Sequence, residues 1–181
     1  MDKPQPDISY RIMSLILKVR DLFSPRIKVL EEVGIETGFH VLDYGCWPGS
    51  YIAGVSRSVG DSGKVYALDI HPLAISKVKA LASSKSLTNV ETILSACDTS
   101  LPDNSIDVVL LYDIFHHLSR PIDVLHEIHR VLKDNGILSV SDHHMKDSEI
   151  SSRMVEGNLF TLLRRDRKTH TLVKNVPSTF L

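Results

Sequence analysis

The stretch VLDYGCWPGS, residues 41–50, starts as an apolar strand and ends in a turn that contains Gly45 and Gly49. A strand, a glycine turn and a following helix are typical of nucleotide-binding α/β folds, because the free N–H groups at the start of the helix attract an anionic ligand. The middle of this turn is unusual, since Trp47 stands where such turns usually carry the smallest residue. The stretch therefore predicts a ligand-binding loop that must also accommodate an indole.

The pattern on the C-terminal side of this loop predicts a parallel sheet. Short, mostly apolar segments occur at 39–43, 64–69, 90–95, 106–112 and 137–142, and helical stretches at about 50–59, 72–86 and 121–132 separate them. Strands that alternate with helices form parallel, doubly wound α/β sheets. After Asp142 the order changes, with a predicted helix at 147–156 and a predicted hairpin at 158–176 around a charged turn. We expect one α/β core over residues 37–181.

The first 36 residues are predicted to be helical. Apolar residues recur at helical spacing over 7–22, which predicts an amphipathic helix whose apolar face lies against the domain. The residues of that face are Ile8, Ile12, Leu15, Ile16, Val19, Leu22 and Phe23. Ser24 is expected to cap a second helix, with Pro25 at its first position and Gly34 at its end.

Composition favours a single domain without nucleic-acid or membrane partners. The chain has 181 residues, 43% of them hydrophobic, with a net charge of -1, so no overall positive field attracts phosphate backbones or anionic lipid. No signal-peptide pattern opens the sequence, and a cytoplasmic location is expected. Cys46 and Cys97 are too few for a disulfide framework or a four-cysteine zinc site. The oligomeric state is not predicted.

Acidic residues follow three of the predicted strands. Asp43 precedes the glycine turn, Asp69 follows Gly49 by twenty residues, and Asp98 ends the third strand segment. A carboxylate at the position of Asp69 can accept both hydroxyls of a ribose. Three carboxylates in one cleft favour an adenosine ligand with few phosphates, because they repel a pyrophosphate. The alternative is that each Asp only caps a helix or a turn.

Four segments together resemble a known family. VLDYGCWPGS, VYALDI, CDTSLPDNSIDVVLLYDIFHHL and LHEIHRVLKDNGILSVSDHH resemble, in order, the motifs of class I S-adenosylmethionine-dependent methyltransferases. The resemblance spans residues 38–145 and is nearest to a small-molecule branch that includes quinone-biosynthesis enzymes. It implies a Rossmann-like sheet of seven strands, the last of them antiparallel, S-adenosylmethionine as cofactor, and methyl transfer to a small-molecule acceptor.

The resemblance also implies roles for residues at the strand ends. It places the methionine part of the cofactor near the glycine loop, the ribose at the second strand and the adenine between the second and third strands. The residues are Asp43, Gly45 and Gly49 for the loop, Asp69 for the ribose, Ile70, Cys97 and Asp98 for the adenine, and Asp113 near the sulfonium and the acceptor. The helical segment 1–36 is implied to form a lid over the cleft.

Methyl transfer needs mainly alignment and a deprotonated acceptor, so few catalytic side chains are expected. The candidate bases are Asp113, His116, His117 and His143, of which Asp113 and His116 are favoured, and a histidine at such a position can equally be a packing residue. A divalent ion held by Asp113, Asp142 and His143 is an alternative that lacks a supporting acidic cluster, so no metal is expected.

Other ligand classes fit the sequence less well. Nicotinamide dinucleotides favour G-x-G-x-x-G, but Trp47 and Ser50 stand at the third and sixth positions counted from Gly45. The Asn/Asp-Pro-Pro-aromatic motif of base methylation is missing after the fourth strand.

Trp47 is the main departure from the family pattern. Pro48 is expected to bias residue 47 toward extended geometry. The indole is expected either to fold outward against the N-terminal helix or to occupy volume meant for the methionine tail and ribose. We hypothesise that it narrows the site and weakens cofactor binding. The alternative function is a non-catalytic or weakly active binding protein with the same fold.

Overall fold

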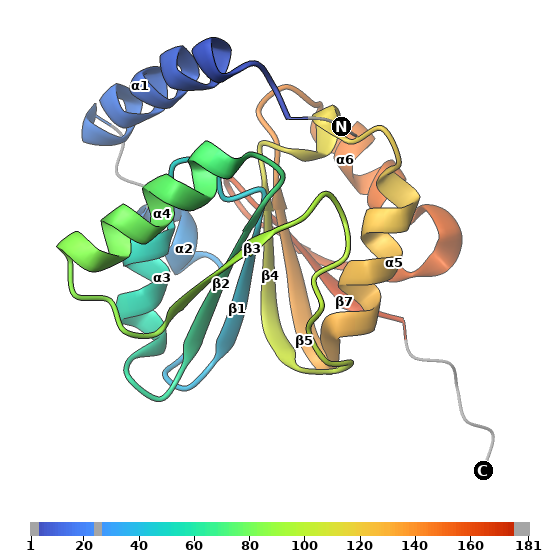
Figure 1. Cartoon of the computed structure of the whole chain (residues 1–181). Coiled ribbons are helices and arrows are strands. Elements are labelled where there is room, and N and C mark those ends of the chain that lie inside the picture. Colours follow the sequence, from blue (N-terminus) through green and yellow to red (C-terminus); the bar gives the residue numbers. More distant parts are fainter. Residues whose placement is uncertain (1–3, 24–26, 176–181) are drawn as a thin grey trace.

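The computed structural model describes residues 4–23 and 27–175, which form a seven-stranded mixed sheet between two layers of helices (Figure 1). The strand order is β3-β2-β1-β4-β5-β7-β6. The strands are β1 (His40–Tyr44), β2 (Lys64–Asp69), β3 (Val90–Leu94), β4 (Ile106–Tyr112), β5 (Leu132–Ser141), β6 (Phe160–Arg165) and β7 (His170–Lys174). β7 runs antiparallel to β5 and β6, and the other neighbours are parallel. The predicted Rossmann-like sheet with its antiparallel C-terminal hairpin is confirmed.

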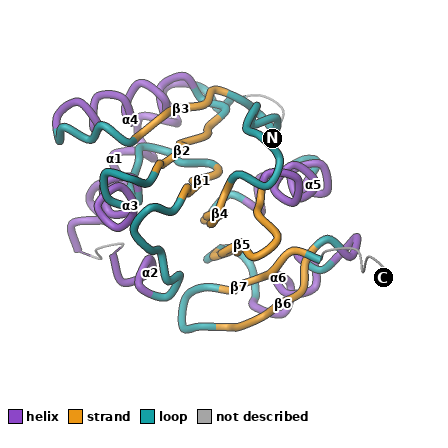
Figure 2. The backbone as a smooth tube through the Cα atoms, turned by 90° about the horizontal axis from the view of Figure 1, so that it is seen from below, coloured by secondary structure: helices purple, strands orange, loops and turns teal. Residues whose placement is uncertain are grey.

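Helices cover both faces of the sheet (Figure 2). One face packs against α2 (Ile27–Glu31), α3 (Ile52–Val59) and α4 (Pro72–Ser84), and the other against α5 (Pro121–Val131) and α6 (Asp147–Met154). Short 3₁₀ turns occur at Phe115–His117 and Glu156–Asn158. Of the residues expected to start the second helix, Ser24 and Pro25 lie outside the described residues. None of the described helices is long and apolar enough to cross a membrane.

The two central strands are mostly apolar because both of their faces are covered. Val41 and Leu42 in β1 and the run 108–111 in β4 are fully buried. The register places Asp43 of β1 between Ala67 of β2 and Leu110 of β4. The carboxyl ends of β1, β2, β4 and β5 therefore meet at one edge of the sheet, with Asp43 deep beneath that edge.

Helix α1 (Asp7–Phe23) forms where the apolar periodicity predicts it, but its predicted orientation is wrong. Five of the apolar side chains that were expected to face the domain are exposed, Leu15 at 64%, and the side chains of Leu22 and Phe23 lie outside the described part of the chain. The other exposed members of this stripe are Ile8, Ile12, Ile16 and Val19. The helix instead buries Tyr10 and Ser14. The physical reason is that the sheet edge offers aromatic and polar partners, which Tyr10 and Ser14 match and aliphatic side chains do not.

Candidate active site

The loop between β1 and α3 is a tight turn that the neighbouring strand holds in place. The N–H groups of Gly45 and Cys46 both donate to the carbonyl of Leu68 at the end of β2, at 2.8 and 2.9 Å. Gly45 has a φ of +82°, and a Cβ added there would lie 2.8 Å from the Ile114 side chain. Both the backbone conformation and the close approach therefore require glycine at position 45.

The expectation of an extended backbone at Trp47 is wrong, because its φ is +49°, in the left-handed region. Its N–H donates to Asp69 Oδ2 at 2.9 Å, and the Gly49 N–H closes the turn onto the Cys46 carbonyl. These hydrogen bonds outweigh the bias from Pro48. Left-handed geometry costs a residue with a Cβ about 1–2 kcal/mol, so the turn stores strain at Trp47.

The indole of Trp47 packs against the N-terminal helix. Its ring stacks on Tyr10 of α1, with centroids 5.7 Å apart and planes inclined by 9°. Tyr10 also contacts the imidazole of His71, with ring centroids 4.2 Å apart. Tyr10 is 2% exposed, so its ring is an interior part of the cleft even though α1 lies on the outside of the fold.

Asp69 already has two hydrogen-bond donors. Trp47 N–H binds Oδ2, and His71 N–H binds Oδ1 at 2.8 Å. Burial raises the pKa of Asp69, and the two amides oppose that shift. The cavity that remains beside Asp69 is about 30 Å³. Its lining consists of Gln5, Tyr10, Trp47, Asp69, Ile70, His71 and Ile114.

The residues predicted to surround an adenine are not all brought together. Ile70 lies beside Asp69 in the small cavity. Cys97, a free thiol, lines a separate hollow of about 20 Å³ with Leu118 and Asp123. Asp98 is exposed, and its Oδ1 accepts the Ser100 N–H at 2.8 Å. Asp98 therefore caps a turn, which is the alternative to a role at the adenine.

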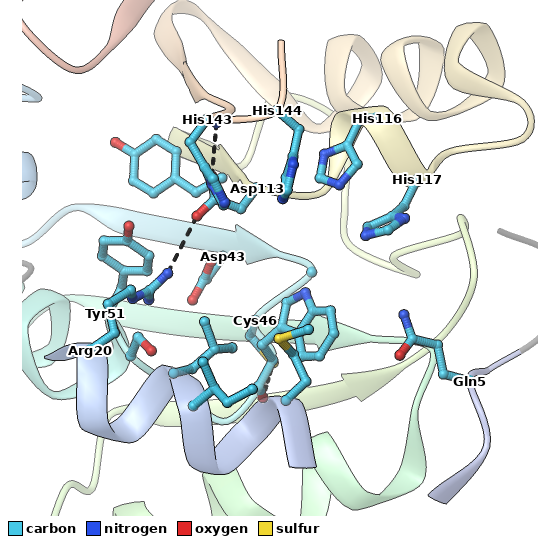
Figure 3. Close-up of a pocket in the computed structure, with 17 residues that line it drawn as sticks. Gln5, Arg20, Asp43, Cys46, Tyr51, Asp113, His116, His117, His143 and His144 are labelled. Atoms are coloured by element: carbon cyan, nitrogen blue, oxygen red, sulfur yellow. Dashed lines mark hydrogen bonds and ion pairs between the residues drawn. The ribbon is translucent and has the colours of Figure 1, made fainter. Parts of the chain in front are cut away.

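A larger cavity of about 370 Å³ lies between the sheet edge and α1 (Figure 3). The sheet side contributes backbone and carboxylates, α1 contributes apolar side chains and one guanidinium, and the loops after β4 and β5 contribute imidazoles. The main lining residues are Asp43, Gly45, Tyr112 and Asp113 from the sheet edge, Met13, Ile16, Leu17 and Arg20 from α1, and His116, His117, His143 and His144 from the loops.

Asp43 is the strongest electrostatic feature of this cavity. Its side chain is buried, and Oδ2 has no hydrogen-bond partner among the residues that the structure describes. Burial, with a smaller contribution from the negative charge of Asp69, raises the pKa of Asp43 from 3.8 to about 7. A buried carboxylate oxygen without a partner is costly unless a ligand supplies a donor. The cavity is therefore suited to a ligand with a cationic or N–H group at this end.

Two histidine–aspartate pairs line the opposite side. His116 Nδ1 lies 2.7 Å from Asp142 Oδ2. His143 Nδ1 lies 2.6 Å from Asp113 Oδ1, as Figure 3 shows. Arg20 of α1 also reaches Asp113, at 3.6 Å. Burial alone would raise the pKa of Asp142, but hydrogen bonds from His116 and His144 outweigh it, so the pKa lies below its usual range. Asp142 is therefore the charged partner of His116.

The four imidazoles form a continuous row. His116 contacts His117 at 3.9 Å and His144 at 4.4 Å, and His144 contacts His143 at 4.0 Å between ring centroids. No group of three or more metal-ligating side chains within residues 4–23 and 27–175 is arranged to hold a metal ion. Asp113 and Asp142 each pair with a different histidine instead of converging on one point.

Sequence reasoning placed Asp113 and His116 correctly at this edge but missed three contributors. These are Tyr10, Arg20 and the pairing of Asp142 with His116. The repeated pattern of an aspartate followed by two histidines, in DIFHH and DHH, was a usable signal for the last one. No local pattern marks Tyr10, because its partners Trp47 and His71 are distant in the sequence.

Comparison with known proteins now identifies the family. The sequence pattern of a methyltransferase-domain family matches residues 35–176, which is most of the chain. The chain belongs to this family. S-adenosylmethionine is the cofactor that the family and the structural neighbours imply.

Curated relatives of this chain include demethylmenaquinone methyltransferases. A demethylmenaquinone methyltransferase from Geobacillus stearothermophilus is 29% identical over 129 residues, which cover 71% of this chain and 55% of the relative. The enzyme of the same name from Lactococcus lactis subsp. lactis is 33% identical over 129 residues, covering 70% and 51%. The chain thus spans about half the length of these methyltransferases.

Solved structures confirm the fold. A SAM-dependent methyltransferase from Aquifex aeolicus superposes with a TM-score of 0.75 at 26% identity, covering 86% of this chain and 97% of the other. A putative sarcosine dimethylglycine methyltransferase from Galdieria sulphuraria has a TM-score of 0.63 at 19% identity, covering 76% and 60%. At that identity the second comparison concerns the fold alone.

The two ends of the cleft fit S-adenosylmethionine unequally. At the Asp43 end, a carboxylate oxygen that has no partner in the described part of the chain and a glycine backbone suit the amino group and chain of a methionine. At the Asp69 end, a cavity of about 30 Å³ cannot take a ribose and an adenine, because Tyr10 and Trp47 fill the space. The methionine end fits, and the adenosine end does not while α1 is in this position.

Proposed function

We propose that this methyltransferase-family chain transfers a methyl group to a small-molecule acceptor inside the cavity of about 370 Å³. The observation that carries the proposal is the buried Asp43 carboxylate, which faces a histidine-lined cavity at the carboxyl edge of the sheet. Bound S-adenosylmethionine supplies a methyl group on a sulfonium, which reacts by in-line displacement. Family membership and the names of the relatives support this reaction over the non-catalytic alternative.

We assign cofactor binding to residues of the sheet edge. Asp43 accepts the cationic amino group, while Gly45 and Gly49 allow the loop to approach the ligand. Asp69 and Ile70 hold the ribose and adenine once space is available there. Cys97 and Asp98 border the adenine only if their loop moves toward Ile70, and Asp113 borders the methyl group.

His116 is the base in this proposal. The Asp142 carboxylate at Nδ1 favours the tautomer that carries its proton there, which leaves Nε2 as an acceptor for a proton from the substrate. Because the Asp142 side chain is fully buried and charged, it also stabilises the imidazolium that forms. Asp113 is less suited to proton transfer, since His143 and Arg20 already hold its two oxygens. We assign Asp113 to positioning the acceptor.

The acceptor that best matches this lining is a planar hydroxylated ring. Met13, Ile16 and Leu17 provide an apolar side, and the row of imidazoles provides stacking surfaces and proton acceptors. The relatives are named for demethylmenaquinone, which in its reduced form is such a ring. We therefore propose a demethylated quinol as the first acceptor to test.

We further infer a cytoplasmic protein without a nucleic-acid partner. The support is the net charge of -1, which provides no field for a polyanion.

The test combines binding with turnover. S-adenosylmethionine and its demethylated product should raise the melting temperature, because a ligand of the native state stabilises it by mass action. Quinols, phenols, amines and thiols are then assayed for methylation. His116→Ala should lower kcat by about 10²–10⁴-fold and leave cofactor affinity unchanged, whereas His126→Ala, an exposed imidazole on α5, should change neither. Cofactor binding without methylation of any acceptor would favour the non-catalytic alternative.

A further inference from the structure

Helix α1 closes one end of the cofactor cleft and leaves the other end open. Beside Asp43 the cavity measures about 370 Å³, and beside Asp69 it measures about 30 Å³. The Tyr10 ring lines the smaller cavity, is 2% exposed and contacts the rings of both Trp47 and His71. The part of the cleft that must take a nucleoside is thus filled by a side chain of the protein itself.

The closed arrangement is unfavourable at two residues, Tyr10 and Trp47. The hydroxyl of Tyr10 is buried, yet it has no hydrogen-bond partner among residues 4–23 and 27–175. A buried polar group without a partner is unfavourable relative to the same group in water. Trp47, on which the Tyr10 ring stacks, has left-handed backbone geometry that its Cβ disfavours. Displacing Tyr10 returns its hydroxyl to water, so the closed arrangement is poised to open.

Besides the Tyr10 stack, polar contacts hold the N-terminal segment on the domain. Lys77 of α4 hydrogen-bonds Ser14, the His71 ring binds the Gln5 carbonyl at 3.0 Å, and Arg20 reaches Asp113. The side chains of Ile8, Ile12, Leu15 and Val19 are exposed, so they do not anchor α1. Elements held by few buried apolar contacts open at low free energy.

We propose that α1 is a gate for the nucleoside end of the cofactor, with Tyr10 as its closing residue. The proposal rests on the proposed function for the identity of the ligand. The cofactor binds at full strength only when Tyr10 has left the space between Trp47 and His71, and Asp69 then faces the ribose. The apparent affinity of the cofactor is therefore the intrinsic affinity multiplied by the open fraction.

Two substitutions at Tyr10 test the gate because they act in opposite directions. Tyr10→Ala removes the obstruction and should tighten binding of S-adenosylhomocysteine by about tenfold or more in calorimetry. Tyr10→Phe removes only the unpartnered hydroxyl, so it should stabilise the closed arrangement and weaken binding by about three- to tenfold. A residue that merely supports the fold would weaken binding in both variants. Ile12→Ala, on the exposed stripe of the same helix, is the matched control and should leave affinity unchanged.

A second measurement needs no ligand. Trp47 is the single tryptophan of the chain, and the gate covers it with Tyr10. Acrylamide should quench its fluorescence more strongly in Tyr10→Ala than in the wild type, and less strongly in Tyr10→Phe. If neither the wild type nor any variant binds the nucleoside ligand, while quenching follows this order, the proposed function is wrong and the mobility of α1 stands. Equal affinity and equal quenching in all three proteins would overturn the gate.

Discussion

Asp43 makes the stability of the fold depend on pH. A carboxyl whose pKa rises from 3.8 to about 7 on folding binds more protons in the folded than in the unfolded state between these values. The free energy of unfolding therefore falls as pH rises from about 4 to about 7. At 1.36 kcal/mol per pKa unit, the single-site effect is on the order of 4 kcal/mol, part of which belongs to the coupled Asp69.

Asp43→Asn should remove most of that pH dependence. The variant should be more stable than the wild type at pH 7 and should lose this advantage as pH falls toward 4, because the wild-type carboxyl becomes neutral there. Urea unfolding at pH 4.5, 6 and 7.5 measures the difference, with exposed Asp61→Asn as control. A constant difference between variant and wild type across this range would contradict a raised pKa at Asp43.

Trp47 combines a strained backbone with a side chain in the cleft. Trp47→Gly should relieve the left-handed geometry, worth about 1–2 kcal/mol, and should remove half of the stack that holds Tyr10. We expect S-adenosylmethionine to bind tenfold or more tightly to the variant, on the scale of ~1–3 kcal/mol for relieving overpacking. Calorimetric titration of both proteins measures this change. An equal or weaker affinity in the variant means that the indole does not obstruct the cofactor.

At the scale of elements, amphipathicity predicted where α1 forms but not which side it buries. The stripe from Ile8 to Val19 has helical spacing, and such stripes usually pack on a core. Here the helix crosses the carboxyl edge of the sheet, where Trp47 and His71 pack against Tyr10, which lies on the opposite side of the helix from the stripe. A periodic pattern carries no information about such partners, because it measures only the spacing of apolar residues along the chain.

Two alanine substitutions compare the contribution of the exposed stripe to stability with that of the core. Ile12→Ala on α1 should change the free energy of unfolding by no more than about 0.5 kcal/mol, since the side chain is already 58% exposed. Leu110→Ala in β4, where the side chain is fully buried, should cost about 2–5 kcal/mol. Chemical denaturation of both variants gives the comparison. A large loss of stability for Ile12→Ala would mean that the stripe is covered in solution.

At the scale of the whole molecule, the sheet was the most predictable part. Each strand segment predicted from 39 to 142 became a strand of the parallel portion, and the change of pattern after Asp142 became the hairpin. The reason is that buried parallel strands are continuous apolar runs and that chain order and handedness restrict their arrangement. The carboxyl-edge position of Asp43, Asp69 and Asp113 followed from the same rules.

The amino-acid sequence by itself determined the elements of this protein, its glycine loop and the acidic residues that end its strands, because each depends on neighbours within a few positions. Only the tertiary structure decided the contacts across the cleft. His116 meets Asp142 across 26 residues, Trp47 meets Asp69 across 22, and His71 meets the Gln5 carbonyl across 66. These contacts set the left-handed turn at Trp47, the closed position of Tyr10 and the charged partner of His116. Their geometry depends on the packing of whole elements against one another, which local spacing cannot specify.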